Sequence, residues 1–171
     1  MSYELRLLGR FQLSDDGSPA LFVRRPVQRL LVYLTLRGRR ELRPLAAAAL
    51  WPELPDKRAL ANLRSVLWRC HQELPDLLAA DDVALWLEPA VRVDYLEGTS
   101  LDSWFQDLLP GWTEDWVGLP RFLHRQTRLQ LIEEQVRSLI DRGQREDAAR
   151  LLIRLVDQEP ARESARALCE L

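Results

Sequence analysis

The sequence predicts a small α+β domain followed by an all-α helical domain. Alternating apolar residues and turn residues before position 24 indicate strands, whereas two apolar stripes at helical spacing, with a short proline-bounded helix between them, follow between positions 26 and 74. Beyond position 98 the pattern is helical throughout. We therefore expect one domain at residues 1–97 and a second at 98–171, each within the roughly 50–250 residues that domains span.

Strands open the first domain. Apolar residues alternate from 4 to 13, so we expect one strand there, with a bulge or bend at Gly9. A cluster of turn residues at 15–18 then leads to a short returning strand at 20–23.

Three helices follow the strands. The first opens at Pro26, because proline is tolerated in a first turn, and ends at Gly38. The second covers residues 45–50 and stops where Pro52 prevents its continuation. The third extends over about 57–74, where a proline again closes it.

A hairpin and a last strand complete the domain. Two short apolar runs flank Asp81-Asp82, which suits a turn, and residues 91–95 alternate cleanly. We interpret the two acids as a solvated turn rather than as a metal-binding or acid–base pair. Strands, three helices and a hairpin form the plan of a winged helix, in which the third helix enters the major groove of DNA.

The net charge of −2 conceals a strong local imbalance. Positions 24–71 hold eleven Lys or Arg residues against three acids, a surplus of +8. Positions 99–171 hold ten Arg residues against thirteen acids, a balance of −3. A phosphate-facing module joined to a neutral or acidic one shows such segregation, and a merely solvated arginine-rich face is the alternative.

The third predicted helix has two faces. Leucines and Cys70 repeat every three to four residues on one side, as in a buried stripe. The other side carries hydrogen-bond donors of the kinds that contact base edges and phosphates, and no acid interrupts it before Glu73. A solvated face would mix acids with bases for i,i+4 pairing, so this pattern favours a polyanionic partner. The candidate DNA-binding residues are Lys57, Arg58, Asn62, Arg64, Ser65, Arg69 and Gln72.

Two runs carry a resemblance to a known family. They are ALWP at Ala49–Pro52 and ALANLRSVLWR at Ala59–Arg69. Together with Leu7–Phe11 near the start and Val93-Asp94 near the end, they resemble the DNA-binding domain of the Streptomyces antibiotic regulatory protein (SARP) family over about residues 4–97.

This resemblance implies a winged helix similar to that of response regulators. It also implies promoter binding, often at direct repeats, with recruitment of RNA polymerase, so double-stranded DNA and RNA polymerase are the expected partners. By the same resemblance, the loop at 53–56 is the candidate contact with polymerase. The residues that it places on or near the recognition surface are Arg58, Asn62, Arg64, Ser65 and Arg69.

The hairpin departs from the family pattern. Family wings commonly have a longer tip with glycine or basic residues, whereas this tip is short and carries Asp81-Asp82. Two carboxylates repel phosphates, which argues against a contact between this wing and the minor groove.

The second domain is expected to consist of helices at 101–109, from Pro120 to about 142, at 145–159 and from about 162. The long helix has an apolar stripe that begins with Phe122 and Leu123, and the tryptophans just before it are expected to pack between helices. Helix, tight turn, helix, proline and helix in this order are typical of a tetratricopeptide-like repeat.

The segment 107–117 resembles the entry to the bacterial transcriptional activator domain that follows the winged helix in SARP-type regulators. Family members usually continue for several helices after a stretch like Pro160–Ser164, whereas this chain stops at Leu171. Either the chain is truncated, or a shortened regulator covers its open apolar face by self-association as a homodimer through the helical domain.

Enzyme chemistry finds no support in the sequence. His71 and His124 have no Cys or paired carboxylate at ligand spacing, and His71 is expected to be a surface donor. There is no glycine-rich phosphate loop. Cys70 and Cys169 are expected to be buried thiols rather than a disulfide. We expect no catalytic residue, cofactor or metal.

Neither a signal peptide nor a membrane-spanning stretch is recognisable, so we expect a cytoplasmic protein that makes no membrane contact. A sequence-specific transcriptional activator is the favoured function. A protein-interaction adaptor is the alternative, in which the helical repeats bind a partner and the winged helix is a second docking surface.

Overall fold

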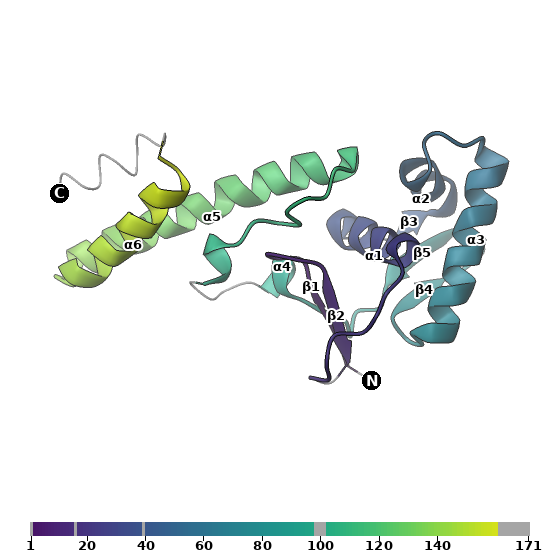
Figure 1. Ribbon diagram of the computed structural model, residues 1–171, viewed down its shortest axis with the longest axis horizontal. Helices are drawn as coiled ribbons and strands as arrows, with labels where there is room; N and C mark the ends of the chain where they lie inside the picture. The colour runs from purple at the N-terminus through teal and green to yellow at the C-terminus, as the bar shows by residue number, and fades with distance from the viewer. Residues whose placement is uncertain (1, 16, 39, 98–101, 161–171) are drawn as a thin grey trace. The chain divides into compact units, whose positions relative to one another are not determined.

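The computed structural model describes residues 2–15, 17–38, 40–97 and 102–160 (Figure 1). A region with two small sheets comes first and a helical region follows, as the predicted order of an α+β and an all-α part requires. The chain divides into two compact units. The first comprises Met1–Glu97 and Leu108–Pro120, and the second comprises Gly98–Asp107 and Arg121–Leu171.

The first sheet has the strand order β2-β1-β6. Strands β1 (Tyr3–Arg6) and β2 (Gln12–Asp15) are antiparallel, and β6 (Arg92–Val93) pairs with β1 in parallel. The prediction of one strand over 4–13 is wrong. The bend that was the alternative to a bulge at Gly9 is confirmed, because Gly9 has a left-handed φ of 75° and the chain reverses there between β1 and β2.

The turn after β2 is confirmed, because the Ser18 amide donates to the Asp15 carbonyl over 2.8 Å. The returning strand predicted at 20–23 is absent from this described segment. Only the Leu21 amide bonds to β2, donating to the Leu13 carbonyl over 2.8 Å, and a single bond forms no ladder.

The three predicted helices of the first unit are confirmed. They are α1 (Arg25–Arg37), α2 (Arg43–Leu50) and α3 (Asp56–Glu73), and each agrees with its predicted bounds to within two residues. Gly38 ends α1 in a left-handed conformation with a φ of 62°, which a residue without a Cβ adopts at little cost.

The second sheet has the order β3-β5-β4 and is antiparallel throughout. The predicted hairpin is confirmed as β4 (Leu78–Ala80) and β5 (Ala84–Leu87). Strand β3 (Glu41–Leu42) was not predicted, because two residues are too short to show a periodic pattern.

The strand expected at 91–95 is shorter than predicted. It ends at Val93, and α4 (Asp94–Glu97) follows directly. The Asp94 carboxylate accepts hydrogen bonds from the amides of Leu7, over 2.8 Å, and Leu8, over 3.2 Å, and so fixes α4 to the first sheet. Burial, the largest effect, raises the pKa of Asp94 although these hydrogen bonds oppose it.

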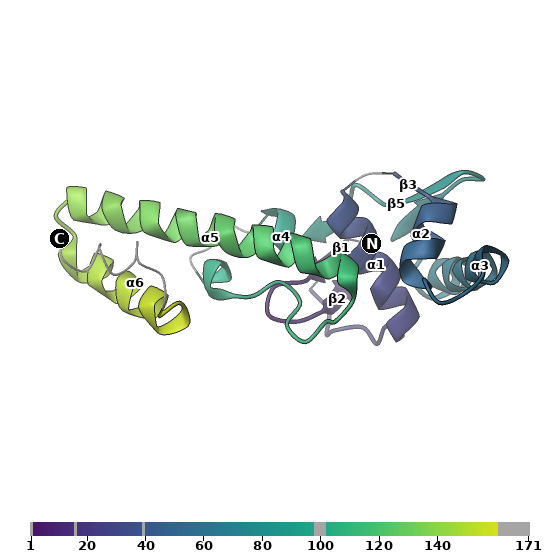
Figure 2. The same ribbon diagram turned by 90° about the horizontal axis from the view of Figure 1, so that it is seen from above.

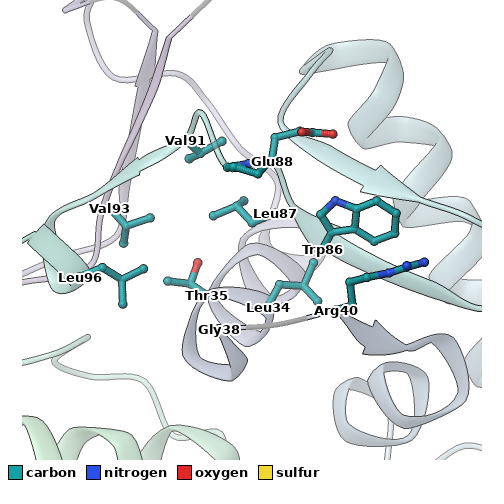
Figure 3. A pocket seen from close by; sticks show the side chains of 11 residues that line it. Leu34, Thr35, Gly38, Arg40, Trp86, Leu87, Glu88, Val91, Val93 and Leu96 are labelled. Atoms are coloured by element: carbon teal, nitrogen blue, oxygen red, sulfur yellow. The ribbon is translucent and has the colours of Figure 1, made fainter.

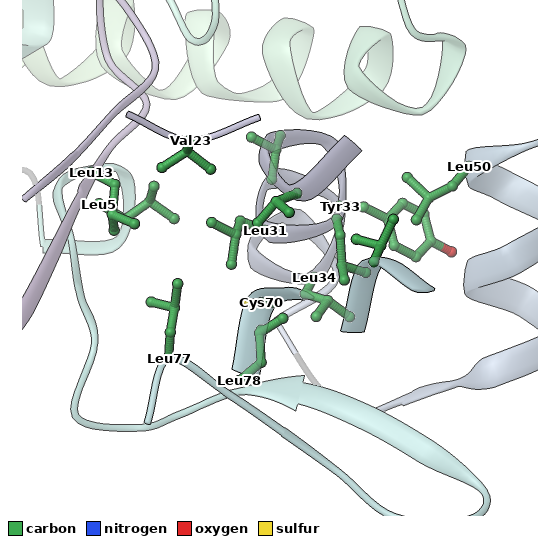
Figure 4. Packing of buried hydrophobic residues seen from close by; sticks show 14 of the residues in the cluster. Leu5, Leu13, Val23, Leu31, Tyr33, Leu34, Leu50, Cys70, Leu77 and Leu78 are labelled. Atoms are coloured by element: carbon green, nitrogen blue, oxygen red, sulfur yellow. The ribbon is translucent and has the colours of Figure 1, made fainter. Parts of the chain in front are cut away.

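The core of the first unit lies between its helices and its sheets (Figure 4). Cys70 is fully buried there, as predicted. Its burial raises the pKa of the thiol to about 12, and nearby Glu73 adds to the shift. Side chains that are entirely shielded from water in this core include Leu5, Leu13, Leu30, Leu31, Leu63, Leu77 and Leu85.

Residues Leu108–Pro120 pack with the first unit, and we call them the return segment. The Leu109 amide donates to the Leu7 carbonyl over 2.9 Å, and Trp112 and Val117 are buried in the same core as the sheets. This segment therefore belongs to the first unit rather than to a helical domain at 98–171. Its apolar side chains have their partners on elements that lie far earlier in the sequence.

Two aromatic contacts fix the return segment to α1. The guanidinium of Arg25 lies 3.7 Å from the centre of the Trp112 ring, and Trp116 meets Tyr33 edge-on with ring centres 5.3 Å apart. The expectation that these tryptophans pack between helices is correct only in part, because their partners belong to the mixed α and β unit.

Helix α5 (Asp115–Asp141) begins five residues before Pro120, so the prediction that this proline starts the helix is wrong. Val117 is buried in the core of the first unit and Trp116 packs against that core, which stabilises the additional turn. Phe122 and Leu123, expected in the apolar stripe, are instead exposed by 57% and 52%.

The described part of the second unit contains a short 3-10 turn (Ser103–Phe105), α5 from Arg121 onward, and α6 (Arg145–Gln158). Helices α5 and α6 lie side by side (Figure 1 and Figure 2). The predicted helix at 145–159 is confirmed, whereas the one at 101–109 is reduced to the 3-10 turn because Leu108 and Leu109 leave for the first unit. The helix expected from 162, and Cys169, lie outside the described residues.

Candidate nucleic-acid interface

Helix α3 packs against α2 and presents its opposite side to solvent (Figure 1). Its buried side consists of Ala59, Leu63, Val66, Leu67 and Cys70. Residues on the far side recur at spacings of three and four, which places them on one face of a helix. We call this the outer face of α3, and it consists of Lys57, Arg58, Ala61, Arg64, Ser65, Trp68 and Gln72.

The structure brings most of the candidate DNA-binding residues to this face. Five are exposed: Lys57, Arg58, Arg64, Ser65 and Gln72. The other two, Asn62 and Arg69, are half-buried and lie along one flank of the outer face. The predicted face of hydrogen-bond donors therefore exists, but Asn62 and Arg69 are less exposed to solvent than the sequence pattern indicates.

The four cations of α3 share an electrostatic property. None of Lys57, Arg58, Arg64 and Arg69 forms an ion pair with an acid among the described residues. The helix therefore exposes positive charge that the rest of the described chain leaves unneutralised.

Other arginines of the basic stretch are paired. Arg25 and Arg29 lie 2.8 and 3.3 Å from the Glu114 carboxylate of the return segment. Arg37 lies 3.3 Å from Glu41. The +8 surplus of the sequence is thus not one patch, because the arginines of α1 neutralise acids while those of α3 do not.

The start of α3 is closed by the helix's own first hydrogen bonds, and its end contacts the hairpin. At its start, the amides of Arg58 and Ala59 donate to the Pro55 carbonyl over 2.8 and 3.0 Å. Near its end, His71 Nε2 lies 3.1 Å from the Leu78 carbonyl of β4. His71 therefore links the helix to the hairpin, a role that its expected function as a surface donor did not include.

The hairpin tip uses one of its two acids to form the turn. The Asp81 carboxylate accepts hydrogen bonds from the amides of Val83, over 2.9 Å, and Ala84, over 2.7 Å. These two bonds lower the pKa of Asp81, and the guanidinium of Arg40, which pairs with the same carboxylate, lowers it further. Arg43 donates to the Asp81 carbonyl over 2.7 Å.

These contacts change the electrostatics expected of the hairpin tip. The sequence predicts an acidic tip that repels phosphate, but Arg40 and Arg43 lie against Asp81 and balance its charge. The Asp82 side chain is exposed. The local field at the hairpin is therefore less negative than two adjacent carboxylates indicate.

The search for binding residues in the sequence missed Trp68. Its side chain is 66% exposed and lies in the middle of the outer face, four residues after Arg64 and four before Gln72. Placing every residue of the helix at 100° intervals would have revealed it, because that position is opposite the buried stripe. The candidate residues predicted from the sequence are all polar, so this indole is not among them.

A hollow of about 280 Å³ lies beside the root of the hairpin (Figure 3). Its lining is mainly aliphatic, and the hydroxyl of Thr35 already donates to the Leu31 carbonyl over 2.8 Å. Arg40 lies at the rim, 4.3 Å from the centre of the Trp86 ring. No group of three His, Cys, Asp or Glu side chains that could hold a metal ion occurs among the described residues.

Comparison with known proteins adds no family assignment. No protein-family model matches the chain. No curated protein matches it either. Within the described residues, no helix is both long enough and apolar enough to cross a bilayer. The outer face of α3 is therefore the feature from which we infer function.

Proposed function

We propose that the first unit is a winged-helix DNA-binding domain and that the protein is a sequence-specific transcriptional activator. The order of α1, α2, α3 and the β4–β5 hairpin supports this assignment, because winged helices present their third helix and a following hairpin to DNA. The resemblance of Ala49–Pro52 and Ala59–Arg69 to SARP-type regulators also supports it.

The observation that carries the proposal is the unpaired positive charge on α3. A helix with its side chains is about 10–12 Å wide, and the major groove of B-DNA is about 12 Å wide. The helix therefore fits the groove. When α3 lies in it, Lys57, Arg58 and Arg64 contact phosphates or guanine edges, and the Gln72 amide can pair with adenine. Charges paired within the protein, such as that of Arg25, contribute less because their counter-ion is Glu114.

We further propose that the helical unit is a tetratricopeptide-like activator domain. In α6, Ala148 and Leu152 pack against the apolar side of α5, which is the helix-on-helix packing of such repeats. By the family resemblance, recruitment of RNA polymerase in the cytoplasm is the outcome of promoter binding, and the loop at 53–56 contacts the polymerase.

One observation favours the adaptor as a second candidate function. Phe122 and Leu123 expose large apolar side chains on α5, a feature that protein-binding surfaces share. The adaptor predicts a protein partner and no affinity for duplex DNA, so the same binding experiment separates the two functions.

The test is fluorescence anisotropy of the full-length chain with labelled duplexes selected from a random pool. We expect tight binding near 50 mM salt and a fall in log K against log salt with a slope of roughly −4, since four cations release counter-ions. Replacing Lys57 and Arg58 by Ala should flatten this slope. The matched control replaces Arg145 and Arg150 of α6, which should leave it unchanged. Absence of binding near 50 mM salt would refute the DNA-binding function.

A further inference from the structure

Trp68 is the one large apolar side chain of α3 that is exposed, and the remaining apolar groups of this helix face the core or its edge. An indole ring in water forgoes the burial of roughly 150–250 Å² that an aromatic side chain offers. Tryptophan and arginine are enriched among the residues that contribute most of the binding energy at interfaces, so an exposed indole at the centre of a charged face is a candidate contact.

The neighbours of Trp68 are polar and are arranged around it. Arg64 and Ser65 precede it by four and three residues, and Gln72 follows by four, so all three lie next to it on the helix. The Ser65 hydroxyl donates to the Ala61 carbonyl over 3.1 Å and so bonds within its own helix. The centre of the outer face is therefore an apolar ring between a guanidinium and an amide.

The major groove of DNA offers one apolar group to such a ring, which is the C5-methyl group of thymine. Base edges and phosphates otherwise present polar atoms, and these suit Arg64 and Gln72 rather than an indole. A helix that enters the groove with its outer face forward brings Trp68 to the groove floor.

We propose that Trp68 is a specificity-determining residue that packs its indole against the 5-methyl group of a thymine. This inference rests on the proposed DNA-binding function. Arg64 and Gln72 bond to the base pairs or phosphates on either side, so the site contains at least one thymine between positions that accept hydrogen bonds. The half-buried Asn62 and Arg69 approach from the flank.

Uracil provides the matched chemical change, because it pairs as thymine does and lacks only the methyl group. A duplex that the full-length chain selects from a random pool is synthesised with each thymine replaced in turn by uracil. We expect one replacement, or two adjacent ones, to weaken binding about fourfold, the effect of one buried methyl-sized group.

Protein variants then assign the methyl contact to a residue. Trp68→Ala should bind more weakly and no longer distinguish thymine from uracil at that position, whereas Trp68→Phe should retain the discrimination. Arg64→Ala should bind more weakly but still distinguish the two bases. Circular dichroism of each variant confirms that α3 is folded, and we expect no change because Trp68 is exposed.

Two outcomes would overturn the inference in different ways. If the wild-type chain binds duplex DNA but thymine and uracil are equivalent, or the discrimination survives in Trp68→Ala, then Trp68 does not contact a methyl group and the DNA-binding function stands. If no duplex is bound near 50 mM salt, both the function and the inference fail.

Discussion

The guanidinium group has different roles at Arg25 and at Arg64. Arg25 stacks on Trp112 and pairs with Glu114, so its charge stabilises the fold of the first unit. Arg64 is exposed on α3 and pairs with no described acid. Sequence composition counts both in the same basic stretch. Only the structure distinguishes a cation with a counter-ion from one that attracts a polyanion.

Removing the cations of α3 that have no acidic partner, one at a time, should weaken DNA binding. Arg64→Ala and Arg69→Ala are each expected to cost about 1–3 kcal/mol of binding free energy if the side chain contacts a base. Because Arg69 is half-buried on the flank, we expect its effect to be the smaller. Anisotropy titrations at one fixed salt concentration give both values, and Arg150→Ala on α6 is the control. Unchanged affinity in both variants would contradict the assignment of the outer face.

The Cys70 thiol provides a residue-level test of the core. Its pKa is raised to about 12, whereas a thiol in the unfolded chain ionises near 8.5. The stability that this shift contributes is therefore complete below about pH 8.5 and is lost as the pH rises toward 12. At pH 8, in a Cys169→Ser variant, Cys70 should resist a thiol reagent until guanidinium unfolds the protein. Rapid labelling of the native protein would contradict the burial.

At the scale of the elements, the three helices of the first unit and the β4–β5 hairpin were predictable, whereas β3 and the exact ends of β6 were not. The apolar repeats of α1 and α3 extend over three or more turns, so their period and their proline and glycine ends are visible in the sequence. Strand β3 has two residues, and the length of β6 depends on its pairing with β1, a contact between distant segments. Local periodicity does not contain that information.

The residues of the candidate site were predictable from the sequence, but the contacts that surround them were not. The polar residues of α3 follow from helical spacing and five of the seven are exposed. The pairing of Arg40 with Asp81, and the link between His71 and β4, depend on the folded hairpin. Tertiary contacts of this kind determine which charged side chains have no ion-pair partner. A count of charged residues along the sequence does not reveal these contacts.

The β4–β5 turn should depend on the acceptor atoms of Asp81 more than on the exposed Asp82. Asp81→Ala removes the acceptor of two backbone amides and should lower the melting temperature. Asp81→Asn retains one acceptor oxygen and should lower it less, and Asp82→Ala is the control. The pKa of Asp81 is lowered, so its contribution is present above pH 4 and is lost as the pH falls through the folded pKa. Equal melting temperatures for all three variants would contradict this role.

At the scale of the whole molecule, the first unit is discontinuous in sequence. Leu108, Leu109, Trp112 and Val117 complete a core whose other members end at Val93. The sequence predicted two consecutive domains, because composition changes near residue 98 and contains no sign of the return. A fragment ending at residue 97 therefore lacks part of its own core.

Two fragments test this discontinuity. Residues 1–120 should unfold cooperatively, and residues 1–97 should be less stable, since each of the lost apolar side chains contributes about 1.5–3 kcal/mol when buried. Urea denaturation followed by circular dichroism measures the difference. Within the full chain, Trp112→Ala should destabilise by about 3–5 kcal/mol for the same reason. Equal stability of the two fragments would show that the return segment is dispensable.

The return segment also affects the order of events during protein synthesis. A growing chain is synthesised from its N-terminus at about 5–20 residues per second, so about 1–4 s separate the synthesis of residue 97 from that of residue 117. During this interval α1 is present, but Arg25 and Arg29 have no Glu114, and the apolar surface that Trp112 and Val117 later cover faces water. The nascent first unit therefore exposes apolar core residues until its last segment emerges, and we expect synonymous codons that slow translation near position 110 to lengthen that exposure.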